Sequence, residues 1–207
     1  MQVHPLFPQP VYFSKLERSL TKEELKTVNE YRKKVFKNEG NTVSKNKYVL
    51  ENKRLKNLKK DLNKKVIDYF NKIVSTSNSV NPYITQSWFN YTENNQFHHN
   101  HSHPNSYVSG VFYVDAQKEI DTITFHKPGH HGDASYTDLK LEVDKYNIFN
   151  TTAWQFPIET GNVVLFPSFL HHGVDKKKGT NTRISLSFNS FFKGTIGNRD
   201  KLTELII

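Results

Sequence analysis

Apolar residues in the first third of the chain recur at three- and four-residue spacing, which is typical of amphipathic helices. Two such stretches predict helices over residues 22–37 and 52–75. Thr21 and Glu24 form a capping-box pattern that marks the start of the first helix, and Gly40 is expected to follow its end because glycine readily adopts positive φ. We expect both helices to pack on a sheet through the apolar residues Leu25, Val28, Leu58, Leu62 and Ile73.

From residue 77 onward the pattern changes to short runs of β-branched and aromatic residues that are bounded by turn residues. The expected strands are residues 83–91, 96–101, 107–115, 120–125, 152–158, 162–166 and 182–192. No helical stretch separates these runs, so the order of elements argues against alternating βα units. It predicts an α+β, mainly β fold, namely a jelly roll or related double-sheet barrel with two N-terminal helices packed on one sheet.

A length of 207 residues is sufficient for one domain with a substantial core. We expect a single domain over residues 1–207, in which residues 1–76 form an extended segment and the two supporting helices. The β core is then residues 77–192, and residues 193–207 are a C-terminal tail. Prolines among the apolar residues at positions 3–13 are expected at a sheet edge. Residues 127–149 are expected to form a long, partly irregular insertion over the barrel mouth.

The composition excludes several classes of protein. The sequence contains no cysteine, which excludes disulfides and thiolate metal sites. No apolar run approaches the roughly 18–20 residues of a membrane span, and the first residues lack the pattern of a secretory signal. We therefore expect no membrane association and a cytoplasmic location, in a host cytoplasm if the gene belongs to a phage.

The net charge of +9 belongs to the N-terminal part of the chain. Residues 1–80 contain 18 Lys and Arg against 8 Asp and Glu, a balance of +10, whereas the rest contains 11 against 12, a balance of −1. Clustered basic residues are one feature of nucleic-acid-binding proteins. Lysine greatly outnumbers arginine here, however, and no aromatic residues interleave with it as in a nucleic-acid groove. We interpret the basic residues as the solvated faces of the two helices.

A histidine-rich tract at residues 98–103 contains candidate metal ligands. Alternate side chains of a strand share a face, so His101 and His103 point the same way, and His99 shares that face. Two imidazoles at this spacing can occupy adjacent positions on Fe, Zn, Cu or Ni. From spacing alone, the ligand pair is His101 with either His99 or His103. A histidine-rich surface turn that binds no metal is the alternative interpretation.

A third ligand must come from another segment of the chain. His171 and His172 are available, because they follow the strongly apolar residues 163–166. Three protein ligands on one face of a metal leave positions open for a substrate and O2. The spacing does not choose between the two histidines.

The last expected strand has one polar and one apolar face. Arg183, Ser185, Ser187 and Asn189 alternate with Ile184, Leu186 and Phe188. The apolar face must pack into a core, so the polar face is expected to line the interior or mouth of the barrel. A planar guanidinium suits the bidentate binding of a carboxylate. The alternative interpretation is an arginine that is paired with a neighbouring Asp or Glu.

Together these segments resemble a known family, the 2-oxoglutarate/Fe(II)-dependent oxygenases of bacteria and tailed phages. The segments that carry the resemblance are Ser87-Trp88-Phe89-Asn90, residues 101–106, residues 109–114, residues 166–174 and residues 183–189. They span most of residues 80–192 and follow the family's order and spacing. The wider prolyl-hydroxylase-like superfamily has an H-x-D motif, a distal His and a C-terminal Arg on a double-stranded β-helix, and the resemblance implies that cupin-like fold here.

The resemblance also implies a set of metal ligands. His101 matches the first ligand, and His172 matches the distal ligand because Gly173-Val174 follows it. His103 stands where the superfamily has Asp or Glu, which would make the metal site more positive by about one charge. The implied ligands are thus His101, His103 and His172, and the histidines expected outside the coordination shell are His98, His99 and His171.

The cosubstrate site follows from the same resemblance. Arg183 matches the arginine that binds the distal carboxylate of 2-oxoglutarate, and Ser185 lies beside it. Tyr113 sits where related hydroxylases place a tyrosine on 2-oxoglutarate, and Asn90 is a further candidate for the same pocket. No catalytic residue is implied beyond the metal site.

The implied function is that of an Fe(II)- and 2-oxoglutarate-dependent dioxygenase that hydroxylates a C–H bond and releases succinate and CO2. O2 is the co-substrate, ascorbate is an optional reductant, and a peptidyl proline or another protein side chain is the candidate substrate, with a small molecule as an alternative. Two other hypotheses are a non-catalytic, cupin-like metal-binding module and a nucleic-acid-directed oxidative demethylase. We expect no nucleic-acid partner, and the oligomeric state is left open, with a homodimer as one option.

Overall fold

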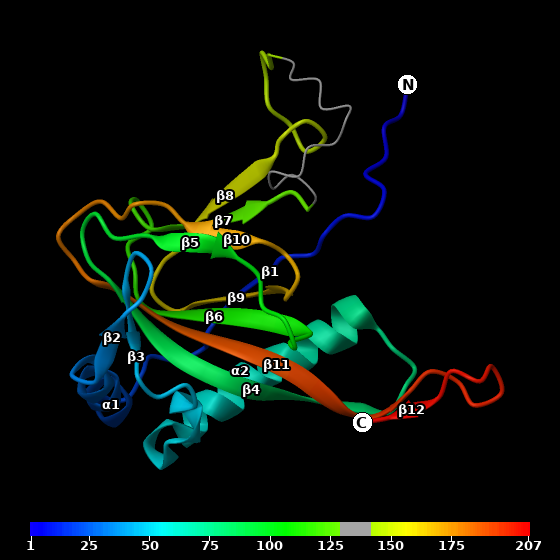
Figure 1. Ribbon diagram of the computed structural model, residues 1–207, viewed down its shortest axis with the longest axis horizontal. Coiled ribbons are helices and arrows are strands. Elements are labelled where there is room, and N and C mark those ends of the chain that lie inside the picture. Colours follow the sequence, from blue (N-terminus) through cyan, green and yellow to red (C-terminus); the bar gives the residue numbers. More distant parts are fainter. Residues whose placement is uncertain (129–141) are drawn as a thin grey trace.

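Two antiparallel sheets form the framework of the protein, which a computed structural model describes for residues 1–128 and 142–207 (Figure 1). Within these residues the larger sheet has, in spatial order, β1 (Tyr12–Lys15), β9 (Asn162–Pro167), β6 (Val108–Asp115), β11 (Arg183–Ile196), β4 (Val80–Thr92), β3 (Thr42–Ser44) and β2 (Val35–Lys37). β12 (Leu205–Ile206) pairs with β11. The smaller sheet is β5 (His98–His101), β10 (His172–Val174), β7 (Thr122–His126) and β8 (Ala153–Pro157). This mainly β, double-sheet architecture confirms the predicted jelly-roll class.

Alternation along β6 shows how one strand contributes to two apolar cores. Val111 and Tyr113 belong to the cluster that also contains residues of β7 from the smaller sheet. Phe112 and Val114 point the other way and join the cluster that the helices cover. The larger sheet is therefore buried on both faces, and its inner face is directed at the smaller sheet.

The two helices lie on the outer face of the larger sheet. α1 (Lys22–Arg32) begins at the expected capping box: the Glu24 backbone N–H donates to Thr21 Oγ1 at 3.1 Å, and the Thr21 N–H donates to Glu24 Oε2 at 2.8 Å. α2 (Lys56–Tyr69) packs against β4 (Figure 1). It is preceded by 3₁₀ turns at Val49–Glu51 and Lys53–Leu55 and is followed by a π-helical segment at Phe70–Val74.

The first helix is shorter than the predicted span of residues 22–37. It ends at Arg32, and residues 35–37 form β2, which pairs with β3 in a hairpin. The physical reason is that Val35 and Phe36 suit a strand better than a helix when a pairing partner is present. Gly40 has a φ of +85° within the hairpin loop, and a Cβ there would lie 2.6 Å from the carbonyl oxygen of Phe97. The glycine is thus required by the loop and not by a helix end.

Two residues of the expected apolar stripe are exposed, which corrects the prediction. Leu25 is 42 % exposed and Ile73 is 43 % exposed, whereas Val28, Leu58 and Leu62 are buried as expected. In α1 the buried face is centred on Glu24, whose carboxylate pairs with Arg18, so Leu25 lies to the side. Ile73 lies in the π-helical segment after α2, where the wider turn directs its side chain away from the apolar stripe of α2.

Several strand boundaries also differ from the prediction. β4 starts at Val80, β11 continues to Ile196, and the N-terminal edge strand is β1 instead of residues 3–13. β10 is a strand that the sequence pattern did not indicate.

The expected insertion at 127–149 falls largely on residues 129–141, which lie outside the described residues. The division of a single domain at residues 76 and 192 stays a prediction. None of the described helices combines the length and hydropathy that crossing a membrane requires.

The buried stripe of α2 provides a test of the fold. Leu62 is fully buried, so Leu62→Ala should lower the free energy of unfolding by about 2–5 kcal/mol, as cavity-creating substitutions do. Leu25→Ala is the matched control, and it should change the free energy by less than about 1 kcal/mol because the side chain is exposed. Urea unfolding measures both values. Equal losses in the two variants would contradict this placement of the helices.

Candidate metal centre

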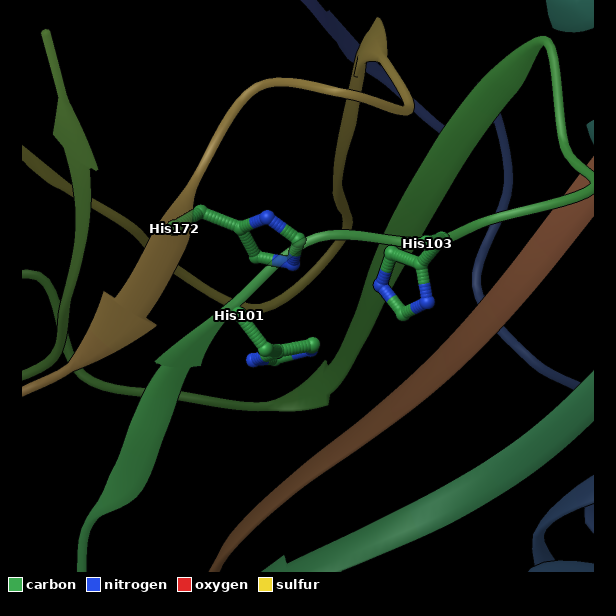
Figure 2. A group of neighbouring side chains, drawn as sticks. All are labelled: His101, His103 and His172. Atoms are coloured by element: carbon green, nitrogen blue, oxygen red, sulfur yellow. The ribbon is translucent and has the colours of Figure 1, made fainter. Parts of the chain in front are cut away.

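Three histidines from two neighbouring strands converge at one point. His101 ends β5, His172 begins β10, and the antiparallel pairing of these strands sets the two residues opposite each other. His103 follows two residues after the end of β5. One ligand nitrogen from each ring lies within 4.8 Å of those of the other two. Figure 2 shows the three rings pointing toward a common space.

Contacts with backbone oxygens hold the rings of His101 and His172 in place, and a backbone hydrogen bond positions His103. The Nδ1 atom of His101 lies 2.8 Å from the carbonyl oxygen of His99, and Nδ1 of His172 lies 3.0 Å from that of Leu170. If Nδ1 carries the hydrogen in each case, the Nε2 lone pair remains available for a metal. The backbone N–H of His103 donates to the carbonyl oxygen of Ser168 at 2.9 Å. The turn after β5 is therefore tied to the turn before β10.

The environment keeps these imidazoles neutral, which is the form that binds a metal. Burial lowers the pKa of His103 to about 4, with a further contribution from the charge of His101. Burial also places the pKa of His172 well below its usual value and lowers that of His101. Among the described residues, the group with metal-binding geometry contains neither His99 nor His171.

His98 enters the same cavity because of a bulge in β5. On β10, His172 pairs with His101 and Val174 pairs with His98, so three steps along β5 match two along β10. The ring of His98 consequently stacks on that of His101, with 4.6 Å between the ring centres. Strand alternation alone would place these two side chains on opposite faces. Gly173 allows the backbone of β10 to lie close to that of β5 at the bulge, since a Cβ there would lie 3.0 Å from the carbonyl oxygen of His98.

His98 is therefore a cavity residue that sequence reasoning missed. Burial lowers its pKa to about 3, so the ring is neutral at physiological pH. The group of three histidines with metal-binding geometry does not include His98. No sequence signal could have placed it in the cavity, because the bulge depends on how β5 pairs with β10.

The residues expected to bind 2-oxoglutarate line the same cavity as the imidazoles. Ser185 on β11 pairs with Asn90 on β4 and with Tyr113 on β6, so these three residues form one row across three strands. Arg183 lies two residues before Ser185 and lines the cavity too. Among the described residues, the polar lining consists of Asn90, His98, His101, His103, Ser109, Tyr113, His172, Arg183, Ser185 and Ser187.

Arg183 is 3 % exposed and incompletely paired. Its Nη2 donates to Thr92 Oγ1 at 3.2 Å, whereas its Nη1 is buried with no hydrogen-bond partner among the described residues. Among the described residues, the carboxylate beside it is that of Asp121, whose Oδ1 lies 3.9 Å from Nη1, too far for a hydrogen bond. Asn90 likewise has a buried, unpartnered Oδ1 within the described structure, while its Nδ2 donates to Ser187 Oγ at 2.9 Å. The unpartnered Nη1 donor suits an anionic ligand, and the Asn90 Oδ1 acceptor suits a hydrogen-bond donor of a ligand.

Sequence reasoning did not single out Asp121 or the buried Lys177 beside it. The alternative interpretation is that Arg183 pairs with a neighbouring Asp or Glu. Among the described residues, the long contact with Asp121 is the interaction of that kind. Burial lowers the pKa of Arg183, while Tyr113 and Asp121 oppose that shift. An arginine nonetheless stays protonated in proteins, so the cavity contains a permanent positive charge.

A groove of about 500 Å³ reaches the metal-binding turn from outside. It is lined by His103 and Pro104, by Ile73 near the end of α2 and by the exposed rings of Tyr107 and Phe169. No Asp, Glu, Lys or Arg is found in its lining within the described residues. The groove therefore offers an uncharged, partly aromatic surface beside the three histidines.

A comparison of sequences finds a family match over the site. A model of the family described as "Putative 2OG-Fe(II) oxygenase" matches residues 86–189, which include all the predicted site residues. No curated protein matches the chain in sequence.

Solved structures share the fold at low sequence identity. The epimerase SnoN from nogalamycin biosynthesis, described as non-heme and alpha-ketoglutarate dependent, is 11 % identical with a TM-score of 0.59, over 92 % of this chain and 82 % of that one. HygX from Streptomyces hygroscopicus, with nickel, 2-oxoglutarate and hygromycin B bound, is 10 % identical with a TM-score of 0.56, over 88 % and 82 %. A 2OG-Fe(II) oxygenase family oxidoreductase from Burkholderia pseudomallei is 12 % identical with a TM-score of 0.53, over 87 % and 83 %.

The geometry predicts which histidines retain a metal. His101→Ala and His172→Ala should each lose most of the bound metal because each removes one ligand of a three-ligand site. His99→Ala and His171→Ala are matched controls that should keep the wild-type stoichiometry. Elemental analysis of Fe(II)-loaded, desalted protein measures the metal content. Metal loss in a control with retention in either ligand variant would show that the ligand set is wrong.

Proposed function

Because the chain belongs to the 2OG-Fe(II) oxygenase family, we propose that it hydroxylates a C–H bond of a peptidyl proline or another protein side chain. The reaction would consume O2 and 2-oxoglutarate, place one oxygen atom in the new hydroxyl group and the other in succinate, and release CO2. The observation that carries the proposal is one cavity that contains the three-histidine group and an incompletely paired arginine.

His101, His103 and His172 would hold Fe(II). The bound Fe(II) supplies the O2 chemistry, for which the protein provides position, charge and exclusion of water. Three neutral imidazoles carry one negative charge less than two histidines and a carboxylate. The site would consequently hold Fe(II) less tightly and accept other divalent metals that favour nitrogen ligands.

Arg183 would bind the distal carboxylate of 2-oxoglutarate. Its buried Nη1 has a hydrogen to donate and no partner within the described residues, and a charge-assisted hydrogen bond to a carboxylate is stronger than a neutral one. Ser185 is two residues away on the same strand face and would add a hydroxyl donor. Tyr113 and Asn90, in the row with Ser185, would contact the rest of the molecule.

The groove beside His103 favours an uncharged, extended substrate. Extended proline-containing segments commonly dock in grooves lined by aromatic rings, because their conformation is already ordered. The exposed rings of Tyr107 and Phe169 provide such a lining next to the metal-binding turn. These features support a peptidyl proline as the substrate more than they support a nucleic acid, which would require basic residues near the site.

The basic N-terminal part is a scaffold in this proposal. Val28 of α1 and Leu58 and Leu62 of α2 are buried. The faces of the helices that contain these residues pack on the protein, and the lysine-rich faces are directed outward. Absence of measurable DNA or RNA binding at low salt would agree with this role. Affinity that falls steeply with salt concentration would favour the nucleic-acid alternative.

Turnover tests the proposal directly. Protein supplied with Fe(II), ascorbate, 2-oxoglutarate and air should release succinate, and a proline-containing peptide that is a substrate should gain the mass of one oxygen atom. The same peptide with leucine in place of proline is the control. Absence of succinate release from metal-loaded protein across a panel of peptides would favour a non-catalytic metal-binding module.

The role of Arg183 predicts a selective loss of 2-oxoglutarate affinity. Arg183→Lys keeps the charge but loses the two-pronged geometry, and an affinity decrease of about 10- to 100-fold is expected from the loss of a charge-assisted hydrogen bond. Ser185→Ala should give a smaller decrease, and metal content should stay near normal in both variants. Calorimetric titration of Ni²⁺-loaded protein without O2 measures this affinity without turnover.

Arg32→Lys is the matched control for this experiment. Arg32 pairs with Glu93 on the surface, so its replacement should leave 2-oxoglutarate affinity unchanged. Wild-type affinity in Arg183→Lys would contradict the carboxylate-binding role of Arg183.

A further inference from the structure

Two buried charged residues, Asp121 and Lys177, lie beside the guanidinium of Arg183. The three residues together are termed the buried charge cluster. Asp121 immediately precedes β7, Lys177 lies in the loop after β10, and Arg183 begins β11. The side chains of Lys177 and Asp121 are both 0 % exposed. The Lys177 Nζ is 3.4 Å from Asp121 Oδ1, and Arg183 Nη1 is 3.9 Å from the same oxygen.

The buried charge cluster has an excess of one positive charge. It contains two cations and one carboxylate, and a buried charge without compensation is costly because it has lost its hydration. An anionic ligand in the neighbouring cavity would neutralise the excess charge.

The hydrogen bonds show that Lys177 is held in place by neutral groups. Its Nζ donates to the carbonyl oxygen of Lys178 at 3.0 Å and to Asn181 Oδ1 at 2.8 Å. Asp121 is anchored through its other oxygen, since the Gln117 backbone N–H donates to Oδ2 at 2.9 Å. Within the described residues, Asp121 Oδ1 and Arg183 Nη1 accept or donate no hydrogen bond. The three charges therefore interact through space, and the lysine is nearer to the carboxylate than the arginine is.

We propose that Lys177 is a positioning residue for 2-oxoglutarate: it offsets the charge of Asp121, so that Arg183 remains available for the distal carboxylate. The proposal rests on the function proposed above and concerns the electrostatics of the same site. Without Lys177, no other cation among the described residues would offset Asp121 beside Arg183, and the pair would be neutral. The carboxylate of the ligand would then compete with Asp121 for the guanidinium.

Three variants separate this electrostatic role from a structural one. Lys177→Met removes the charge at similar length and leaves a net charge of zero, Asp121→Asn leaves +2, and the double variant restores +1. The expected 2-oxoglutarate dissociation constant is at least about tenfold higher in Lys177→Met and no higher than the wild-type value in Asp121→Asn. The double variant should return to within about threefold of the wild type, because the two changes compensate.

The measurement is calorimetric titration of 2-oxoglutarate into Ni²⁺-loaded, full-length protein without O2, and thermal unfolding checks that each variant is folded. Lys65→Met is the matched control, since Lys65 pairs with Glu17 far from the cavity, and it should bind 2-oxoglutarate as the wild type does. A structural role for Lys177 predicts that the double variant binds no better than Lys177→Met.

The outcomes separate this proposal from the proposed function. Wild-type affinity in Lys177→Met, or a double variant more than tenfold weaker than the wild type, would overturn the role of Lys177 alone. If Lys177→Met does not fold, the double variant alone tests the role of Lys177, and the same tenfold loss of 2-oxoglutarate affinity would overturn it. Failure of the wild type to bind 2-oxoglutarate, or unchanged affinity in Arg183→Lys, would instead remove the proposed function.

Discussion

The hydrogen-bond register of β11 with its two neighbours is the constraint on which the site depends. It sets Ser185 between Asn90 and Tyr113, and it directs Arg183 into the same interior space. A slip of one residue would exchange the two faces of the strand and bring Ile184 and Leu186 into the cavity. The register is well determined because the apolar residues of β11 pack in the core beneath α2. Packing on the outer face of the sheet thus fixes the chemistry on its inner face.

The pairing of β5 with β10 plays the corresponding part in the smaller sheet. These short strands place His101 opposite His172, and the bulge between them adds His98 to the cavity lining. The turns that flank the strands are joined by the hydrogen bond from His103 to Ser168. Both sheets therefore contribute to one cavity: the smaller sheet and its turns provide the imidazoles, and the larger sheet provides the polar row and the guanidinium.

The polar interior is not arranged for maximal stability. Arg183 Nη1, Asn90 Oδ1 and Asp121 Oδ1 are buried without hydrogen-bond partners among the described residues, and each such group costs about 1–3 kcal/mol relative to a satisfied one. The two apolar cores on either side of the larger sheet offset this cost. Arg183 and Asn90 line one cavity, and unsatisfied groups are a common feature of ligand sites, where the ligand supplies the missing partners.

The amino-acid pattern was sufficient to predict the mainly β class, the capping box of α1 and most of the strands, because hydrophobic periodicity and local capping depend on near neighbours in the chain. The resemblance of the chain's motifs to a known family also implied His101, His103, His172 and Arg183, which the structure brings to one cavity. The folded structure was needed to show that residues 35–37 form a strand, that Leu25 and Ile73 are exposed, and that His98 enters the cavity. It alone also placed Asp121 and Lys177 beside Arg183. The positions of His98, Asp121 and Lys177 depend on contacts between residues far apart in the sequence, which no local pattern records. Residues 35–37 form a strand because β3 is available as a pairing partner.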